Sequence, residues 1–586
     1  MGKYNIDLPT QEYYARPNAR VLQIWGNLHV FPPYADFLYF LLSFYWLVLI
    51  HIPWPNSGDY GMNLPMNLLS WAAILLQALI VWLSLQADKI RLTPTFLCLL
   101  FSAIAFTLPV FWSPDQGLAI ALPRLTGIWG GVFTYLTLLQ YPPREKEIVA
   151  LSYMIAAAAC IETVYSLMGF WCPQWLPFPL NALAENYSGG APGIFQQRNV
   201  TATFLATGLS LLLVLMADRQ RTLKSFRAET ARRFAICFAI ILISATLVLC
   251  RSRIGWLGGL CGIACASLLF CQQCWRDRTT ACQRLAIIFL PFIGGLLGSV
   301  LLQGSVLNSL AHEGSNQQRL LTLEYTVRLI MTHPWKGIGL GMFESVYQNF
   351  MADLPFANPG REMMQHPHNE TLFIQAEGGI VAFLGGLILL WGWIILFLRP
   401  KSLWQWVTLL TTLPILLHTQ VEFPLYYSVA HFFLILLLMS ATESRKSTFT
   451  LPVKYLRPAL AATALYGIVL SMQLFRASVT LGEFETGRLE PPESIRQLSV
   501  PWLMQIRWQR DLSRLHLMHF NQSGNINELD LFAQENAKWI TMHMEEDAWS
   551  DQINILMFLQ KREEALALRL RAHRLMPWDE RFNPGE

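Results

Sequence analysis

Long apolar runs, separated by short polar loops, are the feature that most constrains what this chain can fold into. Each run has about the length of a helix that crosses a bilayer, roughly 20 residues. Hydrophobic residues make up 53% of the 586 residues and charged residues only 14%, whereas a soluble domain carries about a quarter charged residues. The sequence therefore predicts an all-α, polytopic membrane protein rather than a soluble protein with a large core of buried helices.

Roughly thirteen runs have the length and apolarity of a membrane span. The expected spans are residues 34–52, 68–86, 95–112, 118–140, 149–170, 200–217, 234–250, 254–271, 285–303, 371–398, 403–418, 427–441 and 458–475. The first 33 residues mix polar and aromatic side chains without an early apolar core, so we expect no cleavable signal peptide there.

Lysine and arginine are concentrated in alternate loops, which sets the expected orientation. The richest loop is 218–233, and the loops 272–284 and 443–457 are similar. Such loops stay in the cytoplasm. The N-terminal segment 1–33 is then cytoplasmic, and the long loop 304–370 lies on the opposite side. The net charge of +4 is small and indicates no nucleic-acid partner.

Composition divides the chain into three expected parts. A cytoplasmic segment, 1–33, precedes a transmembrane domain, 34–475, which includes the loop 304–370. The remainder, 476–586, is more charged. Its stretch "REEALALRLRAHRLMPWD" (562–579) has small and apolar residues at helical spacing and then a proline, as in the second half of a tetratricopeptide-like unit. We expect 476–586 to be a helical, tetratricopeptide-like domain on the non-cytoplasmic side.

Unusual polar residues gather on that side in four clusters. The first is "FQQRN" (195–199), which precedes an apolar helix. Its Gln197 and Asn199 are either cap residues or ligands for a sugar or phosphate at the helix N-terminus. The second is the turn with Arg251 and Arg253. Arginine outside the membrane is disfavoured unless it is paired or functional, so the pair either reaches lipid headgroups or grips phosphate.

The third cluster is the long outer loop from residue 316 onward. A helix along the membrane surface is predicted there by apolar residues at helical spacing, namely Leu320, Leu323, Val327 and Ile330. Arg319 stands on another face of this helix. The following "HPWKGIGLG" (333–341) is rich in glycine, but no strand precedes it, so we expect a tight turn rather than a phosphate loop.

The same loop ends in "HPHNE" (366–370), where it re-enters the membrane. Histidine has the side-chain pKa nearest neutrality, so it suits proton transfer from a hydroxyl. A structural histidine pair and a metal site are the alternatives. The spacing of His366, His368 and Glu370 is not that of the H-E-x-x-H zinc helix, and we expect no metal.

The fourth cluster is "HTQVEFPLYY" (418–427) at the outer boundary. Tyr426 and Tyr427 alone would be an ordinary interfacial belt. Glu422 is less ordinary, because it can pair with an arginine or orient a histidine. Together the four clusters predict a basic, histidine-bearing pocket at one membrane face, which suits a lipid-linked substrate with an anionic head.

These residues resemble the bacterial O-oligosaccharyltransferases of the PglL type, which are related to the O-antigen ligases and O-antigen polymerases. "FQQRN" is similar to the family's F-x-Q-P-N element and "SRIGWLG" to S-R-x-x-x-L. "HPWKGIGLGMF" and "HPHNETL" are similar to H-P-x-x-G-x-G-x-x-F and H-x-H-N-x-x-L, and "VEFPLYY" to E-Y-P-L-x-Y. Arg198 stands where proline is usual, and Phe423 where tyrosine is common.

The resemblance implies a GT-C-like helical fold and an undecaprenyl-diphosphate-linked glycan as the donor. It also implies inverting transfer en bloc to a hydroxyl, without metal or cofactor. The expected catalytic residues are His368 as the base, His366 as the second choice for it, and Asn369. The expected ligands of the diphosphate are Arg253, Arg251 and Arg319. The expected substrate-binding residues are Gln197, Asn199, Glu422, Tyr426 and Tyr427.

The acceptor stays open between a protein hydroxyl, for instance on a pilin, lipid A-core, and a growing glycan. The helical domain after 476 favours a periplasmic protein. A transporter for the same glycan is the alternative from another class. It would need polar groups across the bilayer, but charges deep in the spans are scarce, chiefly Arg124, Glu162 and Glu377. We therefore expect an inner-membrane enzyme whose active site faces the periplasm.

Overall fold

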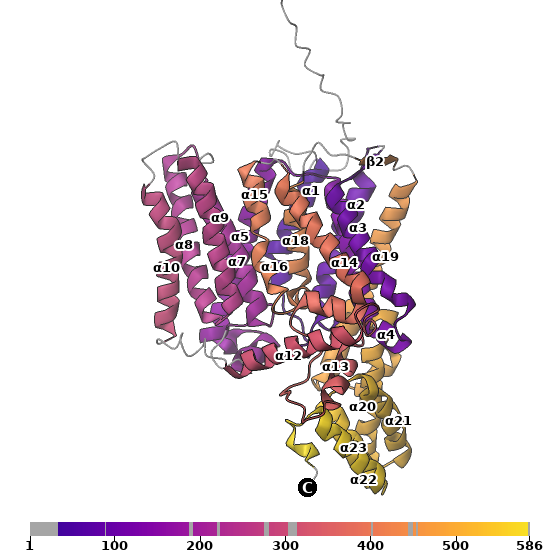
Figure 1. Cartoon of the computed structure of the whole chain (residues 1–586). Coiled ribbons are helices and arrows are strands. Elements are labelled where there is room, and N and C mark those ends of the chain that lie inside the picture. The colour runs from indigo at the N-terminus through magenta and orange to yellow at the C-terminus, as the bar shows by residue number, and fades with distance from the viewer. Residues whose placement is uncertain are drawn as a thin grey trace, which may run out of the picture.

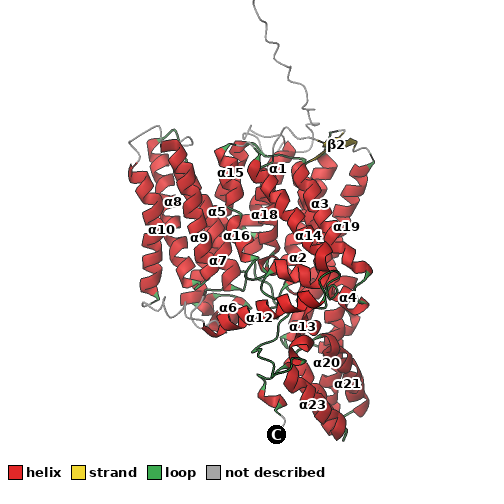
Figure 2. Cartoon of the chain, viewed as in Figure 1, coloured by secondary structure: helices red, strands yellow, loops and turns green. Residues whose placement is uncertain are grey.

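The computed structural model describes residues 33–87, 89–186, 191–218, 223–274, 281–302, 313–399, 402–443, 449–452 and 455–583. Helices make up nearly all of it, as predicted (Figure 2). One small antiparallel sheet, β1 (Lys89–Leu92) paired with β2 (Phe449–Pro452), was not predicted. It joins two loops at one edge of the helical layer. The predicted cytoplasmic segment 1–33 lies outside the described residues except for Pro33.

The upright helices in Figure 1 form one layer. They are α1 (Pro33–Leu47), α2 (Pro65–Ser84), α3 (Pro94–Thr107), α4 (Asp115–Leu139), α5 (Glu145–Trp171), α7 (Arg198–Ala217), α8 (Phe226–Leu249), α9 (Arg253–Cys274), α10 (Ala281–Leu301), α14 (Glu370–Leu398), α15 (Leu403–Leu410), α16 (Leu413–His418), α18 (Val429–Ala441) and α19 (Leu456–Glu485).

The remaining helices lie outside this layer or connect its members. They are α6 (Leu180–Asn186), α12 (Glu313–Thr332), α13 (Phe343–Ala352), α17 (Pro424–Tyr427), α20 (Gln505–Ser523), α21 (Ile526–Met542), α22 (Glu546–Phe558) and α23 (Arg562–Leu575). Short 3-10 turns are η1 (Leu49–His51), η2 (Gly61–Asn63), η3 (Leu108–Phe111), η4 (Pro173–Trp175), η6 (Pro492–Gln497), η7 (Trp502–Met504) and η8 (Glu580–Phe582).

Seven helices among the described residues are long and apolar enough to cross a membrane: α2, α3 with its following turn, α5, α7, α8, α14 and α19. The shorter apolar helices α1, α9, α10 and α18 match four further predicted spans. The last two predicted spans are occupied by α4, which contains Pro123 and Arg124, and by the pair α15 and α16. The chain is thus a multi-pass membrane protein.

The predicted spans 403–418 and 458–475 differ most from the structure, the first in continuity and the second in length. The span 403–418 is broken between α15 and α16, where the Thr411 and Thr412 hydroxyls donate to carbonyls of the preceding turn at 2.7 and 2.6 Å. Pro414 follows and has no N–H to continue the ladder. The span 458–475 is too short, because α19 continues to Glu485 and packs against the C-terminal helices.

Helix α7 is buried along almost its whole length. Small residues let its neighbours approach closely, as is usual between membrane helices. A Cβ atom on Gly208 would lie 2.2 Å from the Cβ of Ala159 on α5, and one on Gly255 of α9 would lie 2.5 Å from the Cβ of Ala202. This packing fixes the N-terminal end of α7, where Gln197 lies.

The glycine-rich segment 333–341 is a turn, as predicted, and it docks against a kink in α14. Gly379 has φ 64° and interrupts the helical ladder there. The amides of Ile338 and Gly339 donate instead to carbonyls of α14, at 2.8 and 3.0 Å. A Cβ atom on Gly379 would lie 2.2 Å from the carbonyl oxygen of Trp335. Only glycine combines this backbone angle with so close an approach.

Helices α12, α13 and α20–α23 lie on one side of the layer, and β2 lies on the other (Figure 1). Of the residues predicted to form an apolar face on α12, Leu320 and Val327 are exposed, whereas Ile330 is buried. The C-terminal helices hold the segment that precedes the histidines: Arg571 pairs with Asp353 at 2.7 Å, and the amide of Met544 donates to Glu344 at 2.7 Å.

Candidate active site

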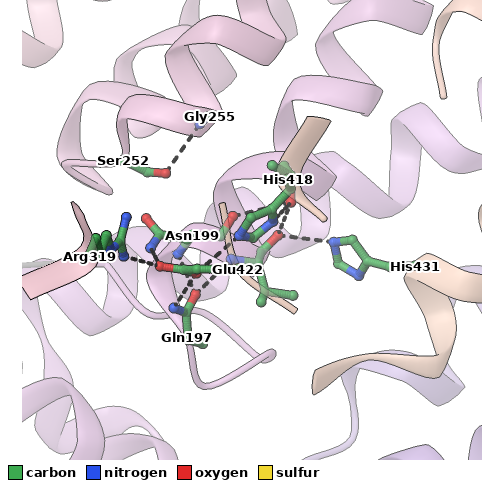
Figure 3. Close-up of polar contacts among 10 residues, drawn as sticks. Gln197, Asn199, Ser252, Gly255, Arg319, His418, Glu422 and His431 are labelled. Atoms are coloured by element: carbon green, nitrogen blue, oxygen red, sulfur yellow. Dashed lines mark hydrogen bonds and ion pairs between the residues drawn. The ribbon is translucent and has the colours of Figure 1, made fainter. Parts of the chain in front are cut away.

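The Glu422 carboxylate is the centre of a polar cluster drawn from three separate segments of the chain (Figure 3). Gln197 Nε2 donates to it at 3.0 Å and Asn199 Nδ2 at 2.7 Å. Arg319 Nη2 donates at 2.5 Å and His418 Nε2 at 3.1 Å. Three of the four clusters predicted from the sequence therefore converge on one buried carboxylate.

Electrostatics keep this carboxylate charged. Burial raises the pKa of Glu422, but the hydrogen bond and charge of His418 and the charge of Arg319 outweigh it and lower the pKa to about 2. A buried carboxylate held by four donors keeps one orientation. The cluster thus fixes the relative positions of α7, α12 and the loop after α16.

Local sequence explains how Gln197 reaches this position. It is the N-cap of α7, and its Oε1 accepts from the amides of Asn199 at 2.6 Å and Val200 at 2.8 Å. The preceding turn is held by Glu162 of α5, whose Oε1 accepts from the amide of Ile194 at 2.9 Å. Gln197 is therefore a cap residue, as one of the two predictions had it, and its Nε2 is used by Glu422. Its predicted role as a ligand for a sugar or phosphate stays a prediction.

His366 has partners on both ring nitrogens. Its Nδ1 accepts from the backbone amide of His368 at 3.0 Å, so the ring proton lies on Nε2, which faces Glu370 at 3.1 Å. The hydroxyl of Tyr426 donates to the other oxygen of Glu370 at 2.9 Å. The Glu370 carboxylate thus orients the His366 ring through Nε2, and the backbone amide of His368 occupies Nδ1.

His368 differs from His366 in this respect. Its Nδ1 is buried and has no hydrogen-bond partner among the described residues. Burial lowers the pKa of His368 to about 4, the Glu422 charge opposes that shift, and the Arg319 charge adds to it. Its backbone adopts φ 55°, which is unusual for a residue other than glycine. A neutral imidazole with a free nitrogen, held in a strained turn, is suited to accept a proton.

Asn369, a predicted catalytic residue, and Phe423, which stands where the related family has tyrosine, both make structural contacts beside the histidines. Asn369 caps α14, where its Oδ1 accepts from Leu372 at 2.9 Å, and its Nδ2 donates to the carbonyl of Gln420 at 3.1 Å. Phe423 packs against the His366 ring at 4.5 Å and stacks with Tyr427 at 5.3 Å between ring centroids. An aromatic wall therefore stands beside both histidines.

The predicted arginines are brought together only in part. Arg319 joins the Glu422 cluster, and Arg253 Nη2 donates to Asn316, one turn earlier on α12, at 2.6 Å. Arg251 adopts φ 51°, and its Nε is buried without a hydrogen-bond partner among the described residues. Ser252 between them caps α9 through the amide of Gly255 at 3.2 Å.

A cavity of about 1360 Å³ opens beside the histidine loop, residues 366–370. His366, Glu370, Phe423 and Tyr426 line it at the membrane boundary, whereas His368 does not. Deeper in the layer its wall is apolar, with Leu68, Trp71, Leu99, Phe106, Trp393 and Phe432. Such a channel has the chemistry of a lipid-tail site.

Sequence reasoning missed part of this wall. Tyr60, from the loop before α2, donates to Gln365 Oε1 at 3.1 Å and packs edge-on against Phe423. Arg124 of α4 pairs with Glu377 of α14 and lies over the ring of Phe373 at 4.7 Å. Arg124 and Glu377 stood out as charges within spans, but nothing in the sequence indicated that they pair. No sequence signal marked Tyr60.

Three models of known protein families match parts of this chain. The O-antigen ligase model matches residues 238–387, and the protein glycosylation ligase model matches residues 191–216. The model of the C-terminal region of the virulence factor membrane-bound polymerases matches residues 406–580. No curated protein matches the chain.

These matches, on a chain of membrane-spanning helices, define the protein as a membrane-embedded glycosyltransferase. The chain belongs to the O-antigen ligase family, with a protein glycosylation ligase segment and a membrane-bound polymerase C-terminal region. The family implies a lipid-linked glycan as the donor and a separate acceptor.

Proposed function

We propose that the chain transfers a glycan en bloc from undecaprenyl diphosphate to a serine or threonine hydroxyl of a periplasmic protein, such as a pilin. The reaction takes place at the periplasmic face of the bacterial inner membrane. The match of 191–216 to the protein glycosylation ligases supports a protein acceptor.

One observation carries the catalytic part of this proposal. Nδ1 of His368 has no hydrogen-bond partner in the described part of the chain, His368 lies two residues from the cavity-lining His366, and the charges of Glu422 and Arg319 act on its ring. A proton acceptor, a cationic group and an apolar channel are the three parts that transfer from a lipid diphosphate requires.

The proposed chemistry is a single displacement. His368 takes the proton of the acceptor hydroxyl while the hydroxyl oxygen forms a bond to the anomeric carbon. The bond between that carbon and the diphosphate oxygen breaks, and its electron pair leaves with undecaprenyl diphosphate. Arg319, Arg253 and Arg251 stabilise the leaving charge. Attack from the face opposite the leaving group inverts the anomeric centre. Asn369 positions the loop through its cap, and Gln197, Asn199, Glu422, Tyr426 and Tyr427 shape the substrate site.

The test is co-expression with a lipid-linked glycan pathway and a candidate pilin, followed by intact-mass analysis of the pilin. We expect a mass increase of one whole glycan, and its loss in His368→Ala. His333→Ala is the matched control, because that histidine is exposed on the same side.

A second candidate follows from the match of 406–580 to the membrane-bound polymerases, in which the acceptor is a hydroxyl of another glycan. The same experiment separates the two functions. Glycan that appears on lipid A-core or as longer lipid-linked chains, with the pilin unmodified, contradicts the protein-acceptor proposal.

A further inference from the structure

The cavity has a second polar end, at the joint between the membrane layer and the C-terminal helices. Residues of α20 and the last residue of α19 line it there: Glu485, Arg507, Arg510, Asp511 and Arg514. Trp539 of α21 and Glu545 complete this wall. None of these residues belongs to the histidine loop or to the Glu422 cluster.

The charged groups of this wall are fixed by one another. Arg507 binds Glu485 through two parallel hydrogen bonds, both 2.7 Å. Arg510 and Arg514 share the carboxylate of Glu545, at 3.2 and 2.8 Å. Planar groups held in this way present their remaining donors and acceptors in set directions.

Asp511 is the member that lacks a full set of partners. It is completely buried, and its Oδ1 lies 3.5 Å from Arg514 Nη1. Its Oδ2 has no hydrogen-bond partner among the described residues, and the same holds for Nε of the buried Arg510. Burial and the neighbouring Glu485 charge raise the pKa of Asp511. A buried carboxyl that keeps its proton offers both a donor and an acceptor.

Trp539 adds an aromatic surface to this wall. Its indole N–H donates to Glu545 at 2.9 Å, and the Arg510 guanidinium lies 4.9 Å from its ring centroid. Alternating donors and acceptors beside an indole match the paired hydroxyls and apolar ring faces of a sugar. A phosphate group would instead meet the carboxylates of Glu485 and Glu545 at close range.

The wall also connects to the histidine loop. Tyr60 donates to Gln365, the residue before His366, at 3.1 Å. Asp59, the residue before Tyr60, also lines the cavity. Burial raises the pKa of Asp59, and the charge of Arg507 opposes that shift. The histidine end and the α20 end are therefore two parts of one continuous space.

We propose that the α20 wall, centred on Arg514 and Trp539 with Asp511 buried behind Arg514, binds the sugars of the donor glycan that lie beyond the one attached to the diphosphate. This inference rests on the proposed function, since it assumes a lipid-linked glycan donor. It gives the C-terminal helices a role in donor recognition, in addition to any acceptor docking on their outer surface.

The test compares two donors with the purified full chain: a polyprenyl diphosphate that carries one sugar, and one that carries several. We expect Asp511→Ala and Arg514→Ala to raise KM for the longer donor about tenfold and to leave the one-sugar donor unchanged. Arg562→Ala, on the exposed start of α23, is the matched control. Asp511→Asn keeps a donor and an acceptor, so we expect near wild-type KM.

An equal loss with both donors, or no loss with either, overturns the inference. Binding of the free oligosaccharide, followed by tryptophan fluorescence, gives a readout that needs no transfer and also serves for variants with low activity. We expect weaker binding in Arg514→Ala, and unchanged binding would contradict the proposal. Wild-type protein that binds this oligosaccharide but transfers neither donor contradicts the proposed function instead.

Discussion

Arg319 of α12 and Glu422 of the loop after α16 form an ion pair of 2.5 Å, although they are 103 residues apart in the chain. The pair ties the helix at the membrane surface to the end of α7, because Gln197 and Asn199 bind the same carboxylate. The site is therefore assembled only when these three segments are folded together.

Glu422→Gln tests this assembly. The amide nitrogen of glutamine would replace one carboxylate oxygen and face two of the four donors, and the Arg319 charge would lose its partner. We expect the free energy of unfolding to fall by about 1–3 kcal/mol and transfer activity to fall at least about tenfold. Thermal unfolding in detergent measures the change in stability, and intact-mass analysis of the acceptor measures the transfer activity. Full activity together with unchanged stability would show that the cluster does not organise the site.

The two histidines are separable by substitution. We expect His368→Ala to lower kcat by roughly 10²–10⁴-fold, the usual contribution of a general base. His366 acts through its contacts with His368 and Glu370, so His366→Ala should have a smaller effect. His366→Asn can still accept from the His368 amide and should recover part of the loss. A larger loss of kcat in His366→Ala than in His368→Ala would assign the general base to His366.

The pH profile reports the protonation state of His368. Burial lowers its pKa to about 4, against an ordinary 6.5, so the ring is neutral and able to accept a proton at pH 7. As the pH falls through about 4 the ring becomes protonated and kcat/KM should fall with it. Arg319→Ala removes a charge that lowers this pKa, so the fall of kcat/KM on the acid side of the profile should move to higher pH. A wild-type limb near 6.5 would contradict the assignment.

Glu162 supports the site from within the membrane layer. Its Oε1 accepts from Ile194 in the turn that leads to Gln197, and Nδ1 of His51 lies 3.9 Å from its Oε2. Glu162→Ala leaves this buried amide without an acceptor, so we expect about tenfold lower transfer activity. Glu162→Gln keeps an acceptor oxygen and should stay close to wild type. Equal activity of the two variants would exclude this positioning role.

Gly379→Ala tests the kink in α14. Alanine would need a left-handed backbone and would bring its Cβ within 2.2 Å of the Trp335 carbonyl oxygen. We expect a loss of at least about 1–3 kcal/mol of stability, measured by thermal unfolding. Gly386 lies on the same helix with nothing near its Cβ position, so Gly386→Ala is the control and should be neutral.

Some features of the fold and site follow from local sequence alone. The apolar runs predicted where helices lie, since burial of about 20 apolar residues in lipid requires a helix. The glycines of 333–341 predicted a turn, because left-handed backbone is accessible to few other residues. The polar residues Gln197, Arg319 and Glu422 stood out because charge and hydrogen-bonding groups are rare at such boundaries.

Other features depend on contacts between distant segments. Nothing local predicted the break at Thr411 and Thr412, the length of α19, or the pairing of β1 with β2, since each is decided by what packs beside it. Tyr60 carried no signal, because an exposed-looking tyrosine in a loop is ordinary.

The sequence by itself determined that this is a helical membrane protein with a polar, histidine-bearing face, because hydropathy and residue chemistry act locally. Only the tertiary structure decided that Glu422 gathers Gln197, Asn199 and Arg319. It also decided that both ring nitrogens of His366 are engaged, whereas Nδ1 of His368 has no partner among the residues that the structure describes. The physical reason is that a hydrogen bond or a pKa depends on distances of a few ångströms between groups that the chain separates by up to hundreds of residues.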